Sequence, residues 1–584
     1  MSQKVENLTE ETLKKAFKRL KKNTRNFSSL LVRDPLDYLD FEVNLYSNLS
    51  SIINEINGNN YHPQKPYLHL SAKSKGINRP TVVFDVKDAL IYRFCIEQIE
   101  DELIKKTRQM HVRGGIKITP NERGNGDDFY EKWIIDWKEY QNDLKKSLQN
   151  KKYLVSTDIA SYFENINTIV LNNLVRSDVA GKKVILNLLF YFLENTRFRF
   201  DYEVNTFNGL PQEDIDCSRI LAYYFLNPND NAMAEFCKVN DAEFYRFVDD
   251  MSITVNSEVA GKKALKTMTE SLRKLNLVSS IEKTSIIDSA QAKSELFFQE
   301  NDDLSKIEEG ILAKLGKNQS VEPEIEILKK FYLELVKAKK DEYKNWIKIL
   351  RRFYTLFTYT KSDFLLKMLH DHIVKYPDLI KVDKIGKYLI RNQNEDSFEK
   401  ALIKIIDYLY SEENLYPAIE SNLLEIFLLI NPDNLSIEIK NKLKILCNDI
   451  FFKSSYQPLS DYARALSCLM FYRFDKSNIK EIANHYLKNS EEDYLLKKYI
   501  VFVCLTISND SLRKKVLNRA KSEQSLSMNR LINLVENIDN YKNFNTVKIF
   551  LKREQLYIYK NKIVEDYSPI RVDILKDLIN IYSD

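Results

Sequence analysis

Glycine is scarce in this sequence and absent beyond Gly386. Nine of the twelve glycines lie between Gly58 and Gly261. Turns, hairpins and close backbone approaches need glycine, whereas a stack of helices can form without it. The first half is therefore expected to mix strands and helices, and the second half to be all-helical.

Cysteine is also rare, and long apolar runs are missing. None of the six cysteines forms a CxxC pair and the six histidines are scattered, which argues against a disulfide framework or a structural zinc site. The longest apolar run, residues 499–507, is far short of the roughly 20 residues that span a bilayer. The polar N-terminal segment lacks the apolar core of a secretory signal, so we expect a cytoplasmic protein with no membrane partner.

Charge of one sign is not in excess either. The 88 basic and 83 acidic residues leave a net charge of only +5, so any track for nucleic acid must be a local patch. What the chain does have is length. Its 584 residues predict two to four domains, each able to bury a core of its own.

Two segments of the first half have the composition of strands that lead into turns. YLVSTDIASYF at 153–163 and FYRFVDDMSITV at 244–255 are rich in β-branched and aromatic residues, and each contains aspartate. Helical patterns cover residues 218–227 and 260–276. The order of strand, helix, hairpin and helix predicts an α+β domain.

Beyond about residue 320, nearly every segment has helical periodicity. Trp346, Leu350, Phe353 and Phe357 are spaced by four, three and four residues, as on one face of a helix. Short polar breaks separate helical blocks of roughly 12 to 18 residues, which predicts paired helices packed into a solenoid.

The aspartates of the two strand segments are candidate ligands for magnesium. Joining a nucleotide to a strand requires an activated 3′-hydroxyl and a neutralised pyrophosphate, which two magnesium ions provide together. Magnesium prefers hard oxygen ligands. Asp158 and Asp249, with Asp250 beside the second, meet this need. An isolated Asp-Asp pair is more often a solvated turn, so the argument depends on the motifs around it.

Four such motifs occur in order, and together they resemble the palm of reverse transcriptases. They are STDIASYFENI at 156–166, NGLPQ at 208–212 running on to SRILA at 218–222, RFVDD at 246–250 and LNLVSSIEKT at 275–284. In the first, an aspartate precedes an aromatic residue by five positions, as in that family. The resemblance implies the fingers and palm of a right-hand polymerase.

The resemblance also implies the metal chemistry. Asp158 and Asp249 would be the metal ligands, assisted by the Ile159 carbonyl, and Asp250 would complete the catalytic set. The cofactor would be Mg²⁺ in a two-metal site, with Mn²⁺ as a substitute.

Four further residues would contact the nucleotide if the roles of the family are carried over. Phe163 occupies the position of the steric gate that excludes a 2′-hydroxyl, although a core aromatic is the alternative reading. Gln212 would shape the floor under the nucleotide and template. Lys283 would approach the triphosphate, or else be a solvated lysine. Arg79, in a segment at 76–94 that resembles the fingers, would also contact the triphosphate.

The sequence departs from the family pattern at several places. Glu213 replaces the glycine that usually follows Gln212, and EDID at 213–216 makes the loop acidic, which disfavours processive copying of a long template. Phe247 stands where tyrosine is usual. No endonuclease, integrase or zinc motif follows the palm.

These departures, the SRI sequence and the long helical region together look like the abortive-infection and related defence-associated reverse transcriptases of bacteria. The expected architecture is fingers and palm at 1–300, then a thumb-like segment and a HEAT-like helical-repeat domain at 301–584. The family implies DNA synthesis, untemplated or primed on protein, in antiphage defence. Expected partners are deoxynucleoside triphosphates, a single-stranded DNA product and other copies of the chain, with a noncoding RNA as a further candidate.

Two rival interpretations remain open. One is an RNA-templated enzyme that copies a noncoding RNA, as in retrons or group II elements. The other is a non-catalytic helical scaffold with a relic polymerase domain, against which the retained Asp158, Asp249 and Asp250 argue.

Overall fold

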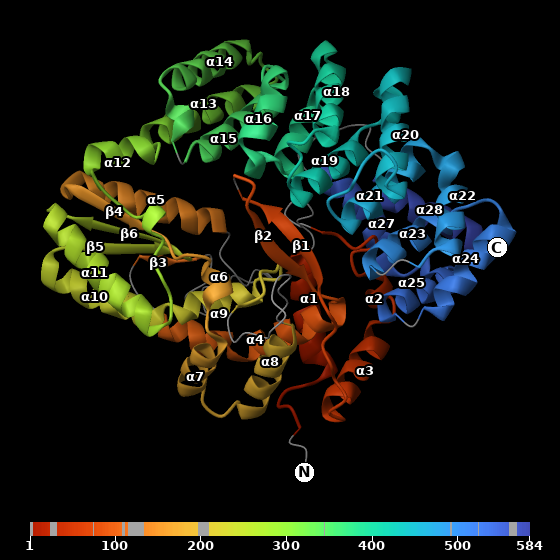
Figure 1. The fold of residues 1–584 in the computed structure, drawn as a ribbon, viewed down its shortest axis with the longest axis horizontal. Coiled ribbons are helices and arrows are strands. Elements are labelled where there is room, and N and C mark those ends of the chain that lie inside the picture. Colours follow the sequence, from red (N-terminus) through yellow and green to blue (C-terminus); the bar gives the residue numbers. More distant parts are fainter. Residues whose placement is uncertain are drawn as a thin grey trace. The chain divides into compact units, whose positions relative to one another are not determined.

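The fold was obtained as a computed structural model, and helices make up most of it (Figure 1). The structure describes residues 4–23, 32–73, 75–107, 111–114, 133–196, 209–343, 345–490, 493–523, 525–559 and 569–583. Within these ranges, no helix has the length and apolar character needed to cross a membrane.

The chain divides into two compact units, which we call the sheet unit and the helical unit. The sheet unit consists of Met1–Asn23, Leu49–Leu68 and Thr81–Asp302, and the helical unit of Thr24–Asn48, His69–Pro80 and Asp303–Asp584. The main part of the helical unit begins at Asp303. It also takes in two segments from the N-terminal part of the chain.

The elements that begin before residue 297 alternate between helices and strands. They are α1 (Glu10–Asn23), α2 (Leu39–Glu42), α3 (Leu45–Asn57), β1 (Tyr67–Ala72), β2 (Asn78–Val83), α4 (Val86–Lys106), β3 (Val112–Arg113), α5 (Trp133–Asn150), β4 (Tyr153–Thr157), α6 (Tyr162–Asn165), α7 (Thr168–Asp178), α8 (Lys183–Thr196), α9 (Cys217–Phe225), α10 (Asn227–Asn240), β5 (Glu243–Phe247), β6 (Asp250–Val255), α11 (Glu258–Lys274), η2 (Ile281–Lys283), β7 (Ser285–Asp288) and α12 (Ser289–Glu295). This part confirms the α+β class.

A five-stranded sheet forms the centre of the sheet unit, with the strand order β3-β5-β6-β4-β7. The pairs β5–β6, β6–β4 and β4–β7 are antiparallel, whereas β3 pairs with β5 in parallel. The two predicted strand segments therefore become neighbours, since β4 pairs with β6 from Tyr153 opposite Val255 to Thr157 opposite Met251.

Helices cover the sheet and bury its apolar side chains. Tyr140, Leu144 and Leu148 of α5 form a core cluster with Leu154 of β4. Helix α11 contacts β4 as well, and a Cβ atom on its Gly261 would lie 2.9 Å from a Val155 methyl group. Glycine at this position therefore allows the helix to approach the strand closely.

The remainder of the chain is helical in every described segment, which confirms the prediction for the second half. The α-helices are α13 (Phe298–Gly316), α14 (Glu322–Lys337), α15 (Trp346–Thr360), α16 (Leu369–Lys375), α17 (Lys387–Arg391), α18 (Asp396–Tyr410), α19 (Pro417–Leu429), α20 (Ile437–Phe452), α21 (Asp461–Phe474), α22 (Ile479–Lys488), α23 (Tyr494–Cys504), α24 (Asp510–Ser522), α25 (Leu526–Glu536), α26 (Ile538–Tyr541), α27 (Asn545–Tyr559) and α28 (Ile570–Tyr582). Helix α21 packs against α19, α20 and α23. Regular solenoid repeats stay a prediction.

The expected apolar face of one helix is present. Trp346, Leu350, Phe353 and Phe357 of α15 are all buried. Their rings pack together, with 6.3 Å between the centroids of Phe353 and Phe357. Burial of this face, rather than helix propensity alone, stabilises such a helix.

A short N-terminal segment, residues 32–43, forms part of the helical unit, and we call it the strap. Its Asp34 and Asp40 both receive hydrogen bonds from the Lys498 ammonium on α23, at 2.6 and 2.8 Å. Lys498 is only 1% exposed and Asp40 only 2%. A cation buried this deeply needs paired anions, so the strap supplies charges without which α23 could not pack as it does.

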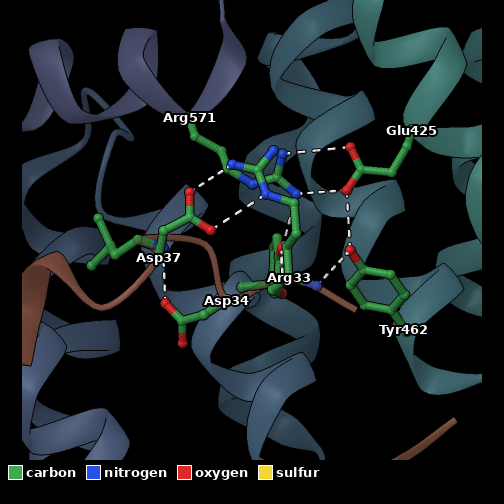
Figure 2. A network of polar contacts seen from close by, with 8 residues as sticks. Arg33, Asp34, Asp37, Glu425, Tyr462 and Arg571 are labelled. Carbon is green, nitrogen blue, oxygen red and sulfur yellow. Dashed lines mark hydrogen bonds and ion pairs between the residues drawn. The ribbon is translucent and has the colours of Figure 1, made fainter. Parts of the chain in front are cut away.

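A second group of polar contacts joins the strap to three helices (Figure 2). Arg33 pairs with Asp37 at 2.7 Å within the strap, and its backbone amide donates to the Tyr462 hydroxyl of α21 at 3.1 Å. Tyr462 in turn donates to Glu425 of α19 at 3.0 Å, and Arg571 of α28 donates to the same carboxylate at 2.7 Å. The strap therefore completes a network inside the helical unit.

The tip of the β1–β2 hairpin belongs to the helical unit too. The Gly76 amide donates to the Tyr416 hydroxyl at 2.8 Å. The ring of His69 meets the ring of Tyr462 edge-on, with 6.1 Å between the centroids. Two separate segments of the N-terminal part thus contact helices that come much later in the sequence.

Candidate active site

The three predicted carboxylates lie at one end of two neighbouring strands. Asp158 directly follows β4, and the turn between β5 and β6 carries Asp249 and leads into Asp250. Because Thr157 pairs with Met251 in the antiparallel ladder, Asp158 lies beside this turn. Asp158 is nearly buried, Asp249 half-buried and Asp250 exposed. The sheet thus brings together residues that are far apart in the sequence.

Asp158 is oriented by its surroundings. Its Oδ1 accepts a hydrogen bond from the Ile159 amide at 3.0 Å, and its backbone carbonyl accepts one from the Ser280 amide at 2.7 Å. The ammonium of Lys283, on η2, bonds to Asp158 Oδ2. Lys283 is therefore in the site, against the carboxylate. Its contact with a triphosphate and the role of the Ile159 carbonyl stay predictions.

Phe163 lies on the short helix α6 and is half-buried, whereas its neighbour Tyr162 is buried. The backbone carbonyl of Phe163 accepts a hydrogen bond from Leu210 at 2.8 Å, and that of Ile166 accepts one from Gly209 at 2.8 Å. These bonds join the first motif to the second. Gly209 has a φ of 105°, a conformation that favours glycine.

The other two predicted nucleotide contacts lie in different units. Gln212, in the sheet unit, is half-buried, and its carbonyl accepts a hydrogen bond from Val82 at 2.7 Å. Arg79 is exposed on β2 in the part of the hairpin that belongs to the helical unit. The contacts of both with a nucleotide stay predictions. Asn208, which opens the second motif, lies outside the described residues.

Glu213, the residue that departs from the family pattern, has a structural role. Its carboxylate accepts hydrogen bonds from the amides of Ile215 and Ser218 at 2.5 and 2.6 Å, at the start of α9. Asp216, the residue before this helix, makes no such capping bond with its side chain. Burial raises the pKa of Glu213 to about 7. Its carboxylate thus accepts hydrogen bonds from backbone amides that have no partner within the helix. Within the acidic stretch at 213–216, Asp214 is the exposed residue.

The sequence interpretation missed Arg246, which lies beneath the turn. Arg246 is fully buried on β5 and bonds to Asp230 of α10, also fully buried, and to the Val248 carbonyl of the turn. A signal for it existed. An arginine between aromatic residues in a strand segment, FYRF at 244–247, indicates a buried charge that requires a partner.

The oxygen atoms of the site fit magnesium. Within the described part of the chain, no three His, Cys, Asp or Glu side chains form a complete cage for a metal ion. Magnesium does not require one, because it is usually held by one or two carboxylates, waters and substrate phosphates. The bond from the Lys283 ammonium shows that Asp158 attracts a cation. Asp158 and Asp249 would hold the metal, which would polarise the reacting phosphate.

The comparisons with known proteins agree with this geometry. Residues 72–303 match the family described as "Reverse transcriptase (RNA-dependent DNA polymerase)". The chain therefore contains a reverse-transcriptase domain there and is an RNA-directed DNA polymerase-like nucleotidyltransferase. Such a domain implies nucleotide substrates and a nucleic-acid template, and its family generally uses divalent metal ions. No curated protein matches the chain.

Proposed function

We propose that this chain adds deoxynucleotides to a growing strand by two-metal catalysis at Asp158, Asp249 and Asp250. The observation that carries the proposal is the position of Asp158 beside the β5–β6 turn, at the same end of paired strands. Oxygen ligands from two strands at one edge are the minimum that a magnesium-dependent nucleotidyltransferase needs. In this assignment, Asp158 and Asp249 bind the metal and Asp250 completes the acidic set.

Phe163 is proposed as the residue that selects deoxynucleotides. It lies on α6, shortly after Asp158, and is only half-buried, so part of the residue is accessible to a ligand. Tyr162, by contrast, directs its hydroxyl to the Ala222 carbonyl inside the unit. Because Phe163 is partly accessible and Tyr162 is bonded inside the unit, Phe163 is the better candidate for the steric gate.

The proposed biological role is antiphage defence, through DNA synthesis that is untemplated or primed on protein. Two features support it. Glu213 caps α9 where the family usually has glycine, so the loop after Gln212 is built differently. In the region after the polymerase domain, all regular elements of the described residues are helices. A helical-repeat arrangement of that region and assembly into homo-oligomers belong to the same proposal.

A second candidate is an enzyme that copies a noncoding RNA. The match of residues 72–303 to an RNA-dependent DNA polymerase family favours it, because that family uses a template. The two candidates share the same catalytic residues. They differ in whether synthesis requires RNA and in what the product is attached to.

The test is incubation of the purified protein with Mg²⁺ and labelled deoxynucleotides, with and without copurified cellular RNA, alongside Asp249→Ala. Product that forms without RNA, is lost in Asp249→Ala and is released from protein only by proteolysis supports self-primed synthesis. Product that requires RNA supports the templated alternative. If neither condition gives product that depends on Asp249, the polymerase assignment is wrong.

The sugar selectivity is tested with Phe163→Ala. Removing the ring should admit ribonucleotides, and we expect their incorporation relative to deoxynucleotides to rise by about 100-fold, the scale of a few kcal/mol of lost discrimination. Competition between labelled ATP and dATP measures the ratio. Phe163→Tyr is the matched control, because it keeps the ring, and unchanged selectivity in Phe163→Ala would remove the gate assignment.

A further inference from the structure

A fully buried ion pair lies directly under the turn that carries Asp249. Arg246 of β5 donates from Nε to Asp230 Oδ1 at 2.7 Å and from Nη2 to Asp230 Oδ2 at 2.5 Å. Both side chains are 0% exposed. This is the bidentate geometry in which a guanidinium and a carboxylate bind most strongly.

The guanidinium has donors left over, and they bind backbone carbonyls. Nη1 donates to the Val248 carbonyl at 2.7 Å, and Nη2 to the Tyr223 carbonyl at 3.3 Å. The guanidinium carbon also lies 4.8 Å from the centre of the Tyr223 ring. One side chain therefore connects α9, which contains the end of the second motif, and α10 to the turn of the third motif.

Val248 needs such a restraint. Its φ of 57° lies in the left-handed region, which is unusual for a β-branched residue and costs on the order of 1–3 kcal/mol. Its amide donates to the Arg113 carbonyl at 3.0 Å, and its carbonyl accepts from Arg246. The peptide plane after Val248 contains the nitrogen and Cα atoms of Asp249. A hydrogen bond that holds the Val248 carbonyl therefore also holds these two backbone atoms of Asp249 in position.

Stability alone does not explain this pair. Replacing a buried ion pair with apolar side chains of similar volume is often neutral or stabilising. Apolar side chains could fill the same space beneath β5, but they could not donate a hydrogen bond to the Val248 carbonyl. The Arg246 guanidinium supplies that bond.

We propose that Arg246, oriented by Asp230, is a positioning residue that sets the direction of Asp249 toward the metal. The inference rests on the proposed function, because it takes Asp249 as a metal ligand. It assigns Asp230 a role through Arg246 and no contact with the substrate.

The test compares the apolar pair Arg246→Met with Asp230→Leu, the single variant Arg246→Lys, and Arg19→Met as a matched control. Arg19 also forms buried ion pairs in the sheet unit, at 2.8 Å to Glu97 and 3.3 Å to Glu100, and these join α1 to α4. Each protein is assayed for thermal unfolding, for the Mg²⁺ dependence of deoxynucleotide incorporation, and for Mn²⁺ binding by electron paramagnetic resonance. Asp249→Ala serves as the reference for a lost ligand.

We expect the apolar pair to stay folded while its rate falls about 100-fold, the scale of a displaced catalytic group. Its Mn²⁺ affinity should fall about 10-fold, as when an outer partner of a metal ligand is lost. Arg246→Lys keeps a cation for Asp230 but lacks the several donors of the guanidinium. Its rate and Mn²⁺ affinity should therefore fall as well. This variant decides the question if the apolar pair does not fold.

Wild-type Mn²⁺ affinity and Mg²⁺ dependence in a folded apolar pair or in Arg246→Lys would overturn the inference, as would an equal loss in Arg19→Met. The metal-binding measurement separates this failure from failure of the polymerase assignment. A wild-type protein that incorporates no nucleotide would remove the proposed function. Weaker Mn²⁺ binding in the Arg246 variants would still show that Arg246 positions Asp249.

Discussion

In the sheet unit, Arg246 and its partner Asp230 are 16 residues apart in the sequence. Arg246 also donates a hydrogen bond to the Val248 carbonyl in the turn between β5 and β6. In the helical unit, Lys498 is 464 residues from Asp34 and 458 from Asp40. Both cations are buried almost completely. The first sets the geometry of one turn, whereas the second joins two segments that are far apart in the sequence.

The difference shows how similar chemistry can serve two purposes. A buried ion pair is a poor source of net stability, but it is strongly directional and leaves an unpaired charge if one partner moves away. Over a short separation, this property fixes a local conformation. Over a long separation, it makes the strap a required part of the helical unit.

The largest effect is expected at Lys498. Lys498→Met removes the cation shared by the half-buried Asp34 and the buried Asp40, and leaves Asp40 with only the longer contact of 3.9 Å to Arg530 among its ion pairs described here. It should lower the free energy of unfolding of the helical unit by about 3 kcal/mol. Lys497→Met is the control, because Lys497 is partly exposed and pairs with Glu523, so about 1 kcal/mol or less is expected. Urea unfolding followed by circular dichroism measures both losses.

The cause of that loss can be separated from lost packing. Combining Lys498→Met with Asp34→Asn and Asp40→Asn removes the unpaired charges, and should recover most of the stability. A triple variant as unstable as Lys498→Met would show that the ammonium stem, rather than the charge, is what the helical unit requires.

The next largest effect is expected on the pH dependence of stability, to which one buried carboxyl group in each unit contributes. Burial raises the pKa of Glu213 in the sheet unit and of Glu420 in the helical unit, each to about 7. Between about pH 4.5 and 7, the folded state then holds protons that the unfolded state has released. The contribution of these two carboxyl groups to the free energy of unfolding should therefore be greatest below pH 4.5 and fall as the pH rises to 7. The fall should be at most about 3 kcal/mol for each group.

Thermal unfolding between pH 5 and 8 checks this sign. Glu213→Gln and Glu420→Gln, which imitate the protonated form, should each flatten part of the profile. Glu324→Gln is the control, because Glu324 is bound by Lys314 and its pKa is lowered instead. A profile that rises with pH and is unaffected by either substitution would contradict the assignment.

The smallest effect is expected at the hairpin tip. Tyr416→Phe removes one hydrogen bond to the Gly76 amide and should cost about 1 kcal/mol. Faster hydrogen exchange in peptides that contain Gly76 would report the loss. Tyr410→Phe, which removes a bond to Asp449 elsewhere in the helical unit, should leave that exchange unchanged.

The parts of the fold that could be predicted from sequence are those with local signals. The β-branched segments around Asp158 and Asp249 identified the strands, and the spacing of Trp346 and Phe353 identified a helix face, because both patterns lie within one element. The pairing of β4 with β6 is not contained in either local pattern, because it joins two segments far apart in the sequence.

The strap and the Arg246 bonds could not be predicted in the same way. The partner of Asp34 is Lys498, and no periodicity connects residues so far apart. For Arg246, the sequence indicates that a partner is needed but does not identify Asp230. For Glu213, the sequence indicates an acidic loop and not a helix cap, because its two hydrogen bonds depend on where α9 begins.

The strap also has a consequence for the order in which the protein is made. Asp34 and Asp40 leave the ribosome early, but their cation is added more than 450 residues later. At about 5–20 residues per second, the strap waits for roughly half a minute or more before Lys498 can reach it. A chain that terminates before Lys498 lacks this cation, so the strap can make these bonds only after α23 has been synthesised.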